Sequence, residues 1–200
     1  MTVLQARDPR TGALDYQFEA TSRDDIERTS NRLRAGGQDW QALGMHGRMA
    51  KLGEFSDALG QHHAAIADRL SVDTGRRAIA AREVDGVIGA IFGWLAQAPN
   101  LLPEGWTDGR NNPAIRHAPQ FVPYSLVGVI SPWNFPLTLS MIDTIPALLA
   151  GCTVIIKPSE VTPRFVEPVM AAIKDAGLQD VLTFVQGDGA TGGALIDHVD

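Results

Sequence analysis

The sequence has little of what several protein classes require. Its 200 residues include one cysteine, so an internal disulfide is excluded, which fits the reducing cytoplasm. It has no block of Lys or Arg, and its net charge of −6 argues against a nucleic-acid surface. It has no run of ~18 or more apolar residues and no apolar segment near its start, so we expect neither a membrane-spanning helix nor a signal peptide.

A metal site is not expected either. His62 and His63 are adjacent on a predicted helix, so their side chains point about 100° apart. No Cys or carboxylate cluster completes a ligand set around them. What the chain does have is 44% hydrophobic residues, enough apolar side chain to bury a core.

Residues 1–98 are predicted to form an N-terminal arm and helices that pack on the domain after them. Ser22 is expected to cap a first helix, and apolar residues at helical spacing predict helices at residues 41–70 and 78–96. Residues 99–124 differ, because five prolines predict an extended linker at a domain crossing. These prolines are Pro99, Pro103, Pro113, Pro119 and Pro123.

Residues 125–200 alternate between apolar runs and helical patterns. Strands are predicted at residues 125–130, 152–156 and 181–185, and helices at 137–149, 163–176 and 190–198. Strands with nearly continuous apolar runs, separated by helices, indicate a parallel sheet covered on both faces. The expected fold class is therefore α/β, with a Rossmann-like, dinucleotide-binding sheet whose first part is residues 125–200.

Two of these helices contain residues that are expected to begin, end or kink them. Thr162 is expected to cap the second, with Pro163 at its first position and Gly177 after its end. Pro146 and Pro168 are expected to kink the first and second helices.

The most informative segment, residues 128–136, reads GVISPWNFP. Its two prolines fix their own φ angles and push the residue before each of them out of the α region. Trp133 and Phe135 are expected to anchor this corner by burial. So stiff a corner is suited to aiming Asn134, whose NH2 group can donate to a developing oxyanion. The alternative is an Asn that bonds within its own turn.

Lys157, Ser159 and Glu160 follow a predicted strand, at the edge where open parallel sheets bind ligands. An ammonium and a carboxylate there can hold a ribose, one donating to its hydroxyls and the other accepting from them. The alternative is a solvated turn with an ordinary ion pair.

Residues 187–192 read GDGATG and fit the G-x-G-x-x-G pattern between a strand and a helix. The acidic residue that completes this fingerprint is expected ~20 residues later, beyond Asp200. A plain glycine-rich turn is the alternative.

Three blocks, in order and spacing, resemble the aldehyde dehydrogenase superfamily: GVISPWNFPL, AGCTVIIKPSEVTP and VQGDGATGG. Looser similarity reaches the N-terminal half, at residues 8–12, Trp40, Arg48, residues 73–75 and residues 83–84. The family's proteins are more than twice as long, so the chain resembles the front part of such an enzyme.

The resemblance implies NAD-dependent oxidation of an aldehyde, as a small-molecule substrate, to a carboxylic acid. Asn134 would be the oxyanion donor to the thiohemiacetal that forms when a cysteine attacks the aldehyde. Cofactor-binding residues would be Ile130, Ser131, Pro132 and Trp133 beside the corner, Lys157, Ser159 and Glu160 at the adenosine ribose, and Gly189 and Gly193 where the adenine approaches the backbone. The Glu160 carboxylate should repel a 2′-phosphate, which favours NAD over NADP. Residues 99–124 would join a homo-oligomerisation element.

The resemblance also sets a limit, because the family's cysteine nucleophile and glutamate base would lie after Asp200. Cys152 is expected to be a buried structural residue. Two alternatives stay open. One is a truncated, non-catalytic module that binds nucleotide or a partner subunit, and the other is a dehydrogenase that uses the glycine fingerprint.

Overall fold

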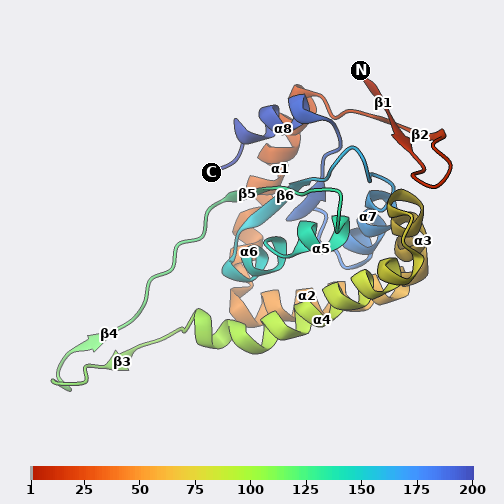
Figure 1. Ribbon diagram of the computed structural model, residues 1–200. Coiled ribbons are helices and arrows are strands. Elements are labelled where there is room, and N and C mark those ends of the chain that lie inside the picture. The colour runs from red at the N-terminus through yellow and green to blue at the C-terminus, as the bar shows by residue number, and fades with distance from the viewer. Residues whose placement is uncertain (1) are drawn as a thin grey trace.

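The computed structural model describes residues 2–200 and places a small parallel sheet between layers of helices (Figure 1). The strands are β1 (Val3–Arg7), β2 (Leu14–Glu19), β3 (Thr107–Asp108), β4 (Arg116–His117), β5 (Leu126–Ile130), β6 (Thr153–Lys157) and β7 (Leu182–Phe184). The helices are α1 (Arg23–Ala42), α2 (Gly44–Gln61), α3 (His63–Thr74), α4 (Arg77–Leu101), α5 (Pro136–Met141), α6 (Thr144–Ala150), α7 (Val166–Asp175) and α8 (Gly189–Ile196).

The central sheet has the order β5-β6-β7, and its strands are parallel. The middle strand, β6, is buried along its whole length. Its side chains alternate between the two faces, because successive residues of a strand point in opposite directions. Ile155 belongs to a core with α1 and α8, and Val154 and Ile156 belong to a larger core on the other face. The predicted α/β fold, a parallel sheet with helices on both faces, is confirmed.

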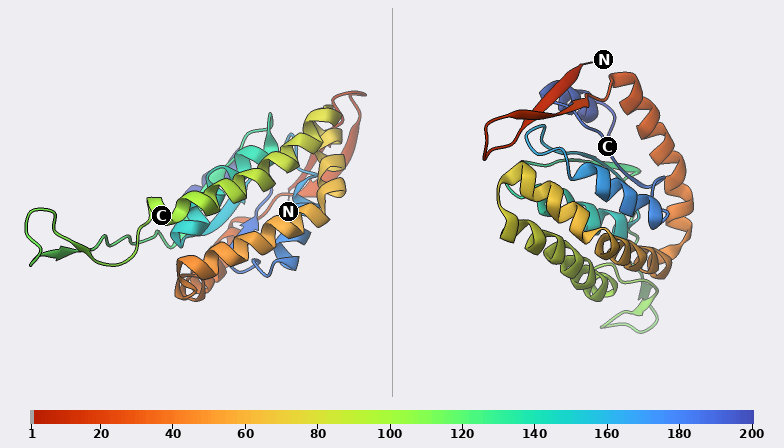
Figure 2. Two further views of the ribbon diagram at one scale, coloured as in Figure 1. Left: turned by 90° about the horizontal axis from the view of Figure 1, so that it is seen from below. Right: turned by 90° about the vertical axis from the view of Figure 1, so that its right-hand side faces the viewer.

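The helices form layers on the two sides of this sheet. In Figures 1 and 2, α1 and α8 lie on one side, and α5, α6 and α7 lie on the other, with α2 and α4 beyond them. The larger core runs through these layers, from β6 to Leu52 and Phe55 of α2 and Val84 and Ile91 of α4. The N-terminal helices therefore share their core with the sheet.

The helix predicted at residues 41–70 is two helices. The chain turns at His62 (φ −91°, ψ 4°), so α2 ends and α3 begins on either side of it. His62 contacts Asp175 at 2.8 Å and His63 contacts Asp85 at 3.1 Å, so the neighbouring imidazoles face different carboxylates. The Ser22 cap is confirmed, because its side chain accepts from the Asp25 amide.

The helix predicted at residues 137–149 is also divided, into α5 and α6. Pro146 is the third residue of α6 and Pro168 is the third residue of α7. The first turn of a helix has amides without intrahelical partners, so a proline is accommodated there. The two prolines thus lie in first turns rather than in the helix interiors where we expected kinks.

Thr162 does not cap α7, contrary to the prediction. The helix begins four residues later, and the buried Thr162 hydroxyl has no partner among the described residues. A tertiary contact takes the amide that a cap at Thr162 would bond, because the Arg164 amide donates to Asp73 of α3 at 2.8 Å. Gly177 ends α7 as predicted, with φ +68°.

The linker begins later than residue 99, because α4 runs to Leu101 and includes Pro99. Beyond it, β3 and β4 pair as an antiparallel hairpin that projects from the body (Figures 1 and 2). No helix among residues 2–200 is long and apolar enough to cross a membrane. The division into residues 1–98, 99–124 and 125–200 stays a prediction.

Candidate active site

The corner after β5 is tied to the inside of the fold through Ser131. Its amide donates to the Lys157 carbonyl at 3.0 Å, and its buried hydroxyl lies 2.8 Å from that of Ser140. The Ser140 hydroxyl in turn donates to the Pro136 carbonyl at 2.6 Å. The corner therefore closes onto the first turn of α5.

Trp133 and Phe135 do not anchor the corner by burial, contrary to the prediction, because 58% and 39% of their surfaces are exposed. A contact from the residue that precedes α4 takes their place. Arg76 donates to the Asn134 carbonyl, and its guanidinium carbon lies 4.9 Å from the centre of the Phe135 ring. The Asn134 side chain itself is exposed.

Glu83 holds the other side of the corner. Its Oε1 accepts from the amides of Leu137 and Thr138, both at 2.9 Å. Burial raises the pKa of Glu83, and the two amides and the Arg76 charge oppose that rise. Sequence reasoning missed Arg76 and Glu83 as site residues. The one available signal was the similarity at residues 83–84.

The Lys157–Glu160 pair lies where predicted, at the carboxyl end of β6. Their Nζ and Oε2 atoms are 3.0 Å apart, and the Lys157 side chain is 6% exposed while that of Glu160 is 43% exposed. Burial opposes ionisation of Glu160, but its own backbone amide and the Lys157 ammonium outweigh it and lower the pKa. The Ser159 hydroxyl accepts from the Val161 amide at 3.2 Å. The edge thus presents a charged carboxylate beside a sheltered ammonium.

The loop that carries this pair is fixed at its far end by Arg164. Its guanidinium bonds Asp73 and Asp15, and it lies 5.0 Å from the centre of the Tyr16 ring. Burial raises the pKa of Asp73 to about 6, against the lowering effect of the Arg164 amide and charge. β2, α3 and the loop after β6 therefore meet at one buried cation.

Helix α8 brings the glycine-rich segment to the ends of both strands. A Cβ at Gly192 would lie 3.8 Å from Ile130 and 3.9 Å from Lys157, so α8 packs against the ends of β5 and β6. Gly189 and Gly193 face open space, with nothing within 4 Å of a Cβ placed on either. A planar group can approach the helix backbone at these two positions.

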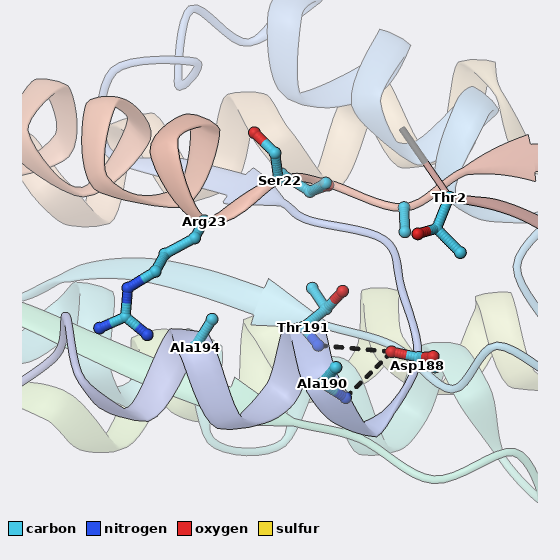
Figure 3. Close-up of a pocket in the computed structure, with 9 residues that line it drawn as sticks. Thr2, Ser22, Arg23, Asp188, Ala190, Thr191 and Ala194 are labelled. Atoms are coloured by element: carbon cyan, nitrogen blue, oxygen red, sulfur yellow. Dashed lines mark hydrogen bonds between the residues drawn. The ribbon is translucent and has the colours of Figure 1, made fainter.

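The amides at the start of α8 are already occupied. The Asp188 carboxylate accepts from Ala190 at 2.9 Å and from Thr191 at 3.4 Å (Figure 3). A dinucleotide fingerprint offers such amides to a pyrophosphate. This capping counts against the dehydrogenase alternative that uses the glycine fingerprint.

A cavity of about 410 Å³ lies between α8 and the N-terminal segment (Figure 3). It is lined by Thr2, Ala20, Thr21, Ser22, Arg23, Asp188, Ala190, Thr191 and Ala194. None of the predicted cofactor-binding residues is among them. The site predicted from the sequence lies at the ends of β5 and β6 and at Gly189 and Gly193 of α8, which do not line this cavity.

Cys152 is 5% exposed, and burial raises the pKa of its thiol. A cysteine acts as a nucleophile through its thiolate. Cys152 is the only cysteine of residues 1–200, so these residues supply no reactive thiol.

Comparison with known proteins adds independent findings. The model of the aldehyde dehydrogenase family matches residues 2–200. The chain is 34% identical over 199 residues to an N-succinylglutamate 5-semialdehyde dehydrogenase of Burkholderia lata, covering 98% of this chain and 40% of that protein. It thus spans about two fifths of the length of this relative.

Solved structures agree with this assignment. A protein described as an aldehyde dehydrogenase, PutA, from Anabaena variabilis is 44% identical and has a TM-score of 0.93, over 100% of this chain and 42% of that one. Two further structures show the fold alone. They are the NAD⁺ complex of a Bacillus cereus aldehyde dehydrogenase (22% identity, TM-score 0.88, 100% and 42% covered) and an NADP complex of a Bacillus halodurans glyceraldehyde-3-phosphate dehydrogenase (21%, 0.85, 100% and 44%).

Proposed function

The aldehyde dehydrogenase family model matches residues 2–200, so the chain belongs to this family, and we propose that it forms the N-terminal, cofactor-binding portion of an enzyme that oxidises an aldehyde to a carboxylic acid with NAD. The observation that carries this proposal is the register of β5 on β6. Ile130 pairs with Lys157, so the Asn134 corner and the Lys157–Glu160 pair follow neighbouring strands at one edge of the sheet.

The residues present fit a dinucleotide. The Lys157 ammonium has donors left beyond its bond to Glu160, and the Glu160 carboxylate has acceptors left for ribose hydroxyls. Gly189 and Gly193 leave the backbone of α8 open for the adenine. Ile130, Ser131, Pro132 and Trp133 are the proposed lining on the corner side. When bound, NAD supplies the acceptor for the hydride that leaves the substrate.

Asn134 is the proposed donor to the oxyanion. A cysteine thiolate that adds to an aldehyde produces a negatively charged oxygen, and a donor already in place stabilises that charge without reorganising. The thiolate has to come from outside residues 1–200, because Cys152 is buried and protonated. What the chain's own residues contribute is therefore orientation and one hydrogen bond.

NAD is proposed over NADP because Glu160 stays charged at neutral pH. A carboxylate that accepts from the ribose hydroxyls would lie beside the 2′-phosphate of NADP, and the two negative charges repel. The family itself uses either cofactor, so this preference rests on the one side chain.

Residues 102–124, which include the projecting β3–β4 hairpin and are called the arm below, form the proposed homo-oligomer surface. Its exposed apolar side chains are Trp106, Ile115, Phe121, Val122 and Tyr124. Exposed groups of this kind mark interaction surfaces. We also retain the cytoplasm as the proposed compartment, on the basis of the cysteine usage.

Titration with NAD and NADP tests the proposed cofactor site. In protein that carries residues 1–200, Glu160→Gln should weaken NAD binding about 10-fold, the equivalent of one hydrogen bond to a charged group. The same change should weaken NADP binding less, or strengthen it, because the repelling charge is gone. Equal NAD affinity of wild type and variant would remove Glu160 from the site.

A second candidate is a nucleotide-binding or subunit-interaction module without turnover. The exposed apolar side chains of the arm support it, because they suit contact with another subunit. Such a module would bind NAD and assemble through its arm, but it would oxidise no aldehyde, with or without a partner chain. Aldehyde-dependent production of NADH separates the two candidates.

A further inference from the structure

Arg76 lies just before α4, where the turn at Gly75 and a hydrogen bond to Thr74 restrain its backbone. Gly75 precedes it with φ +71°, and the Arg76 amide donates to the Thr74 hydroxyl at 3.3 Å. Its side chain reaches residues 58 positions further along the chain, where it donates to the Asn134 carbonyl and lies on the Phe135 ring. One guanidinium therefore holds two successive residues of the corner.

Glu83 lies in the second turn of α4, seven residues after Arg76, which immediately precedes the helix and has non-helical angles (φ −119°, ψ 79°). Pro136 has no amide hydrogen, so Leu137 and Thr138 carry the first free amides of α5. The Glu83 carboxylate accepts from both of them. Arg76 and Glu83 thus hold the corner before and after Pro136.

Little else restrains the outer part of the corner. Pro132, Trp133 and Asn134 are exposed, and the inner ties run through Ser131 and Ser140. Among the described residues, the bond from Arg76 is the one hydrogen bond that reaches Asn134 from another element. The direction of its side chain therefore depends on a residue 58 positions away in sequence.

We propose that Arg76 and Glu83 are positioning residues that fix the direction in which Asn134 presents its side-chain amide. This inference rests on the proposed function of Asn134. It goes beyond that function in assigning α4 a part in the reaction, through the backbone of residues 134–138 and without contact with the substrate.

Steady-state kinetics on protein that carries residues 1–200 and oxidises an aldehyde test the role of Arg76. Arg76→Met should lower kcat about 100-fold, the scale of a misplaced catalytic group. The NAD dissociation constant should stay unchanged, because Lys157 and Glu160 are untouched. Arg76→Lys should recover part of the loss, since it keeps a charged donor but not the planar stack. Arg82→Met, at an exposed residue of α4, is the matched control.

A double-mutant cycle separates positioning from a general structural effect. If Arg76 acts through Asn134, adding Arg76→Met to Asn134→Ala should lower kcat no further. Losses that multiply in the double variant would overturn the proposal.

Hydrogen exchange supplies a readout that needs no turnover. Glu83→Ala should speed exchange of the Leu137 and Thr138 amides, and Glu83→Gln, which keeps an acceptor, should slow it again. Arg76→Met should shift the side-chain amide resonances of Asn134. If the wild type oxidises no aldehyde, the proposed function fails, and these signals still decide whether α4 holds the corner. Unchanged exchange and resonances would overturn the inference.

Discussion

Ile130 and Lys157 end two neighbouring parallel strands and lie directly opposite each other, and the amide that follows Ile130 donates to the Lys157 carbonyl at 3.0 Å. This register places the corner that carries Asn134, the proposed oxyanion donor, beside the Lys157–Glu160 pair, the proposed ribose-binding group. Neither segment alone is specific, since an Asn in a turn and a Lys–Glu pair are common. Their adjacency makes them one candidate site.

Gly187 and Gly189 are predicted to respond oppositely to alanine. A Cβ at Gly187 would collide with the Thr191 side chain, whereas one at Gly189 meets nothing within 4 Å. Gly187→Ala should therefore lower the free energy of unfolding by about 1–3 kcal/mol. Gly189→Ala should leave stability equal or slightly higher and weaken NAD binding. Thermal unfolding and NAD titration of both variants check this. A stable Gly187→Ala protein would contradict the packing described here.

Asp73 is predicted to make stability depend on pH in a particular direction. Burial raises the pKa of the Asp73 carboxyl in the folded protein to about 6, above its ordinary value of 3.8, so folding favours the protonated carboxyl. Its contribution to the free energy of unfolding is present below pH ~4 and is lost as the pH rises through about 6. Between pH 4 and pH 6 the wild type should lose about 2 kcal/mol relative to Asp73→Asn. Urea unfolding at pH 4, 5 and 6 measures the difference, and parallel curves would refute it.

The projecting arm is predicted to control assembly. Trp106→Asp should place a charge in the proposed interface and shift the protein to a smaller species in light scattering. Leu14→Asp, at an exposed residue of β2, is the control and should leave the mass unchanged. The same mass for Trp106→Asp as for wild type would take the arm out of the interface.

Cys152 is predicted to be inert. Its thiol is buried and its pKa is raised, so iodoacetamide should alkylate it slowly in the folded protein and quickly after unfolding. Cys152→Ala should leave kcat unchanged. Loss of aldehyde oxidation in that variant alone, with its fold intact, would make Cys152 the nucleophile after all.

The sheet and its helices could be predicted because their signals are local. The strand from Thr153 to Lys157 is buried on both faces, so its apolar run is continuous, and Gly177 marks the end of α7 by its conformation. The Ser22 cap is likewise a contact within one turn of chain. Such features depend on residues near in sequence.

The wrong predictions, a cap at Thr162 and the burial of Trp133 and Phe135, depend on contacts between residues that are distant in sequence. Thr162 has the chemistry of a cap, but Asp73, 91 positions from Arg164, accepts from the Arg164 amide that such a cap would bond. Trp133 and Phe135 are apolar enough to be buried, yet Arg76 covers one of them from outside. Glu83 reaches Leu137 across 54 positions. No periodicity or spacing encodes these pairs, so one sequence could not reveal what holds the corner.

The most direct test of the proposed site is the turnover number of Asn134→Ala. In protein that carries residues 1–200 and oxidises an aldehyde, the loss of one preorganised oxyanion donor should lower kcat about 10²- to 10³-fold, or about 3–4 kcal/mol of barrier. The NAD dissociation constant, measured on the same variant, should not change. A kcat equal to that of wild type would contradict the account.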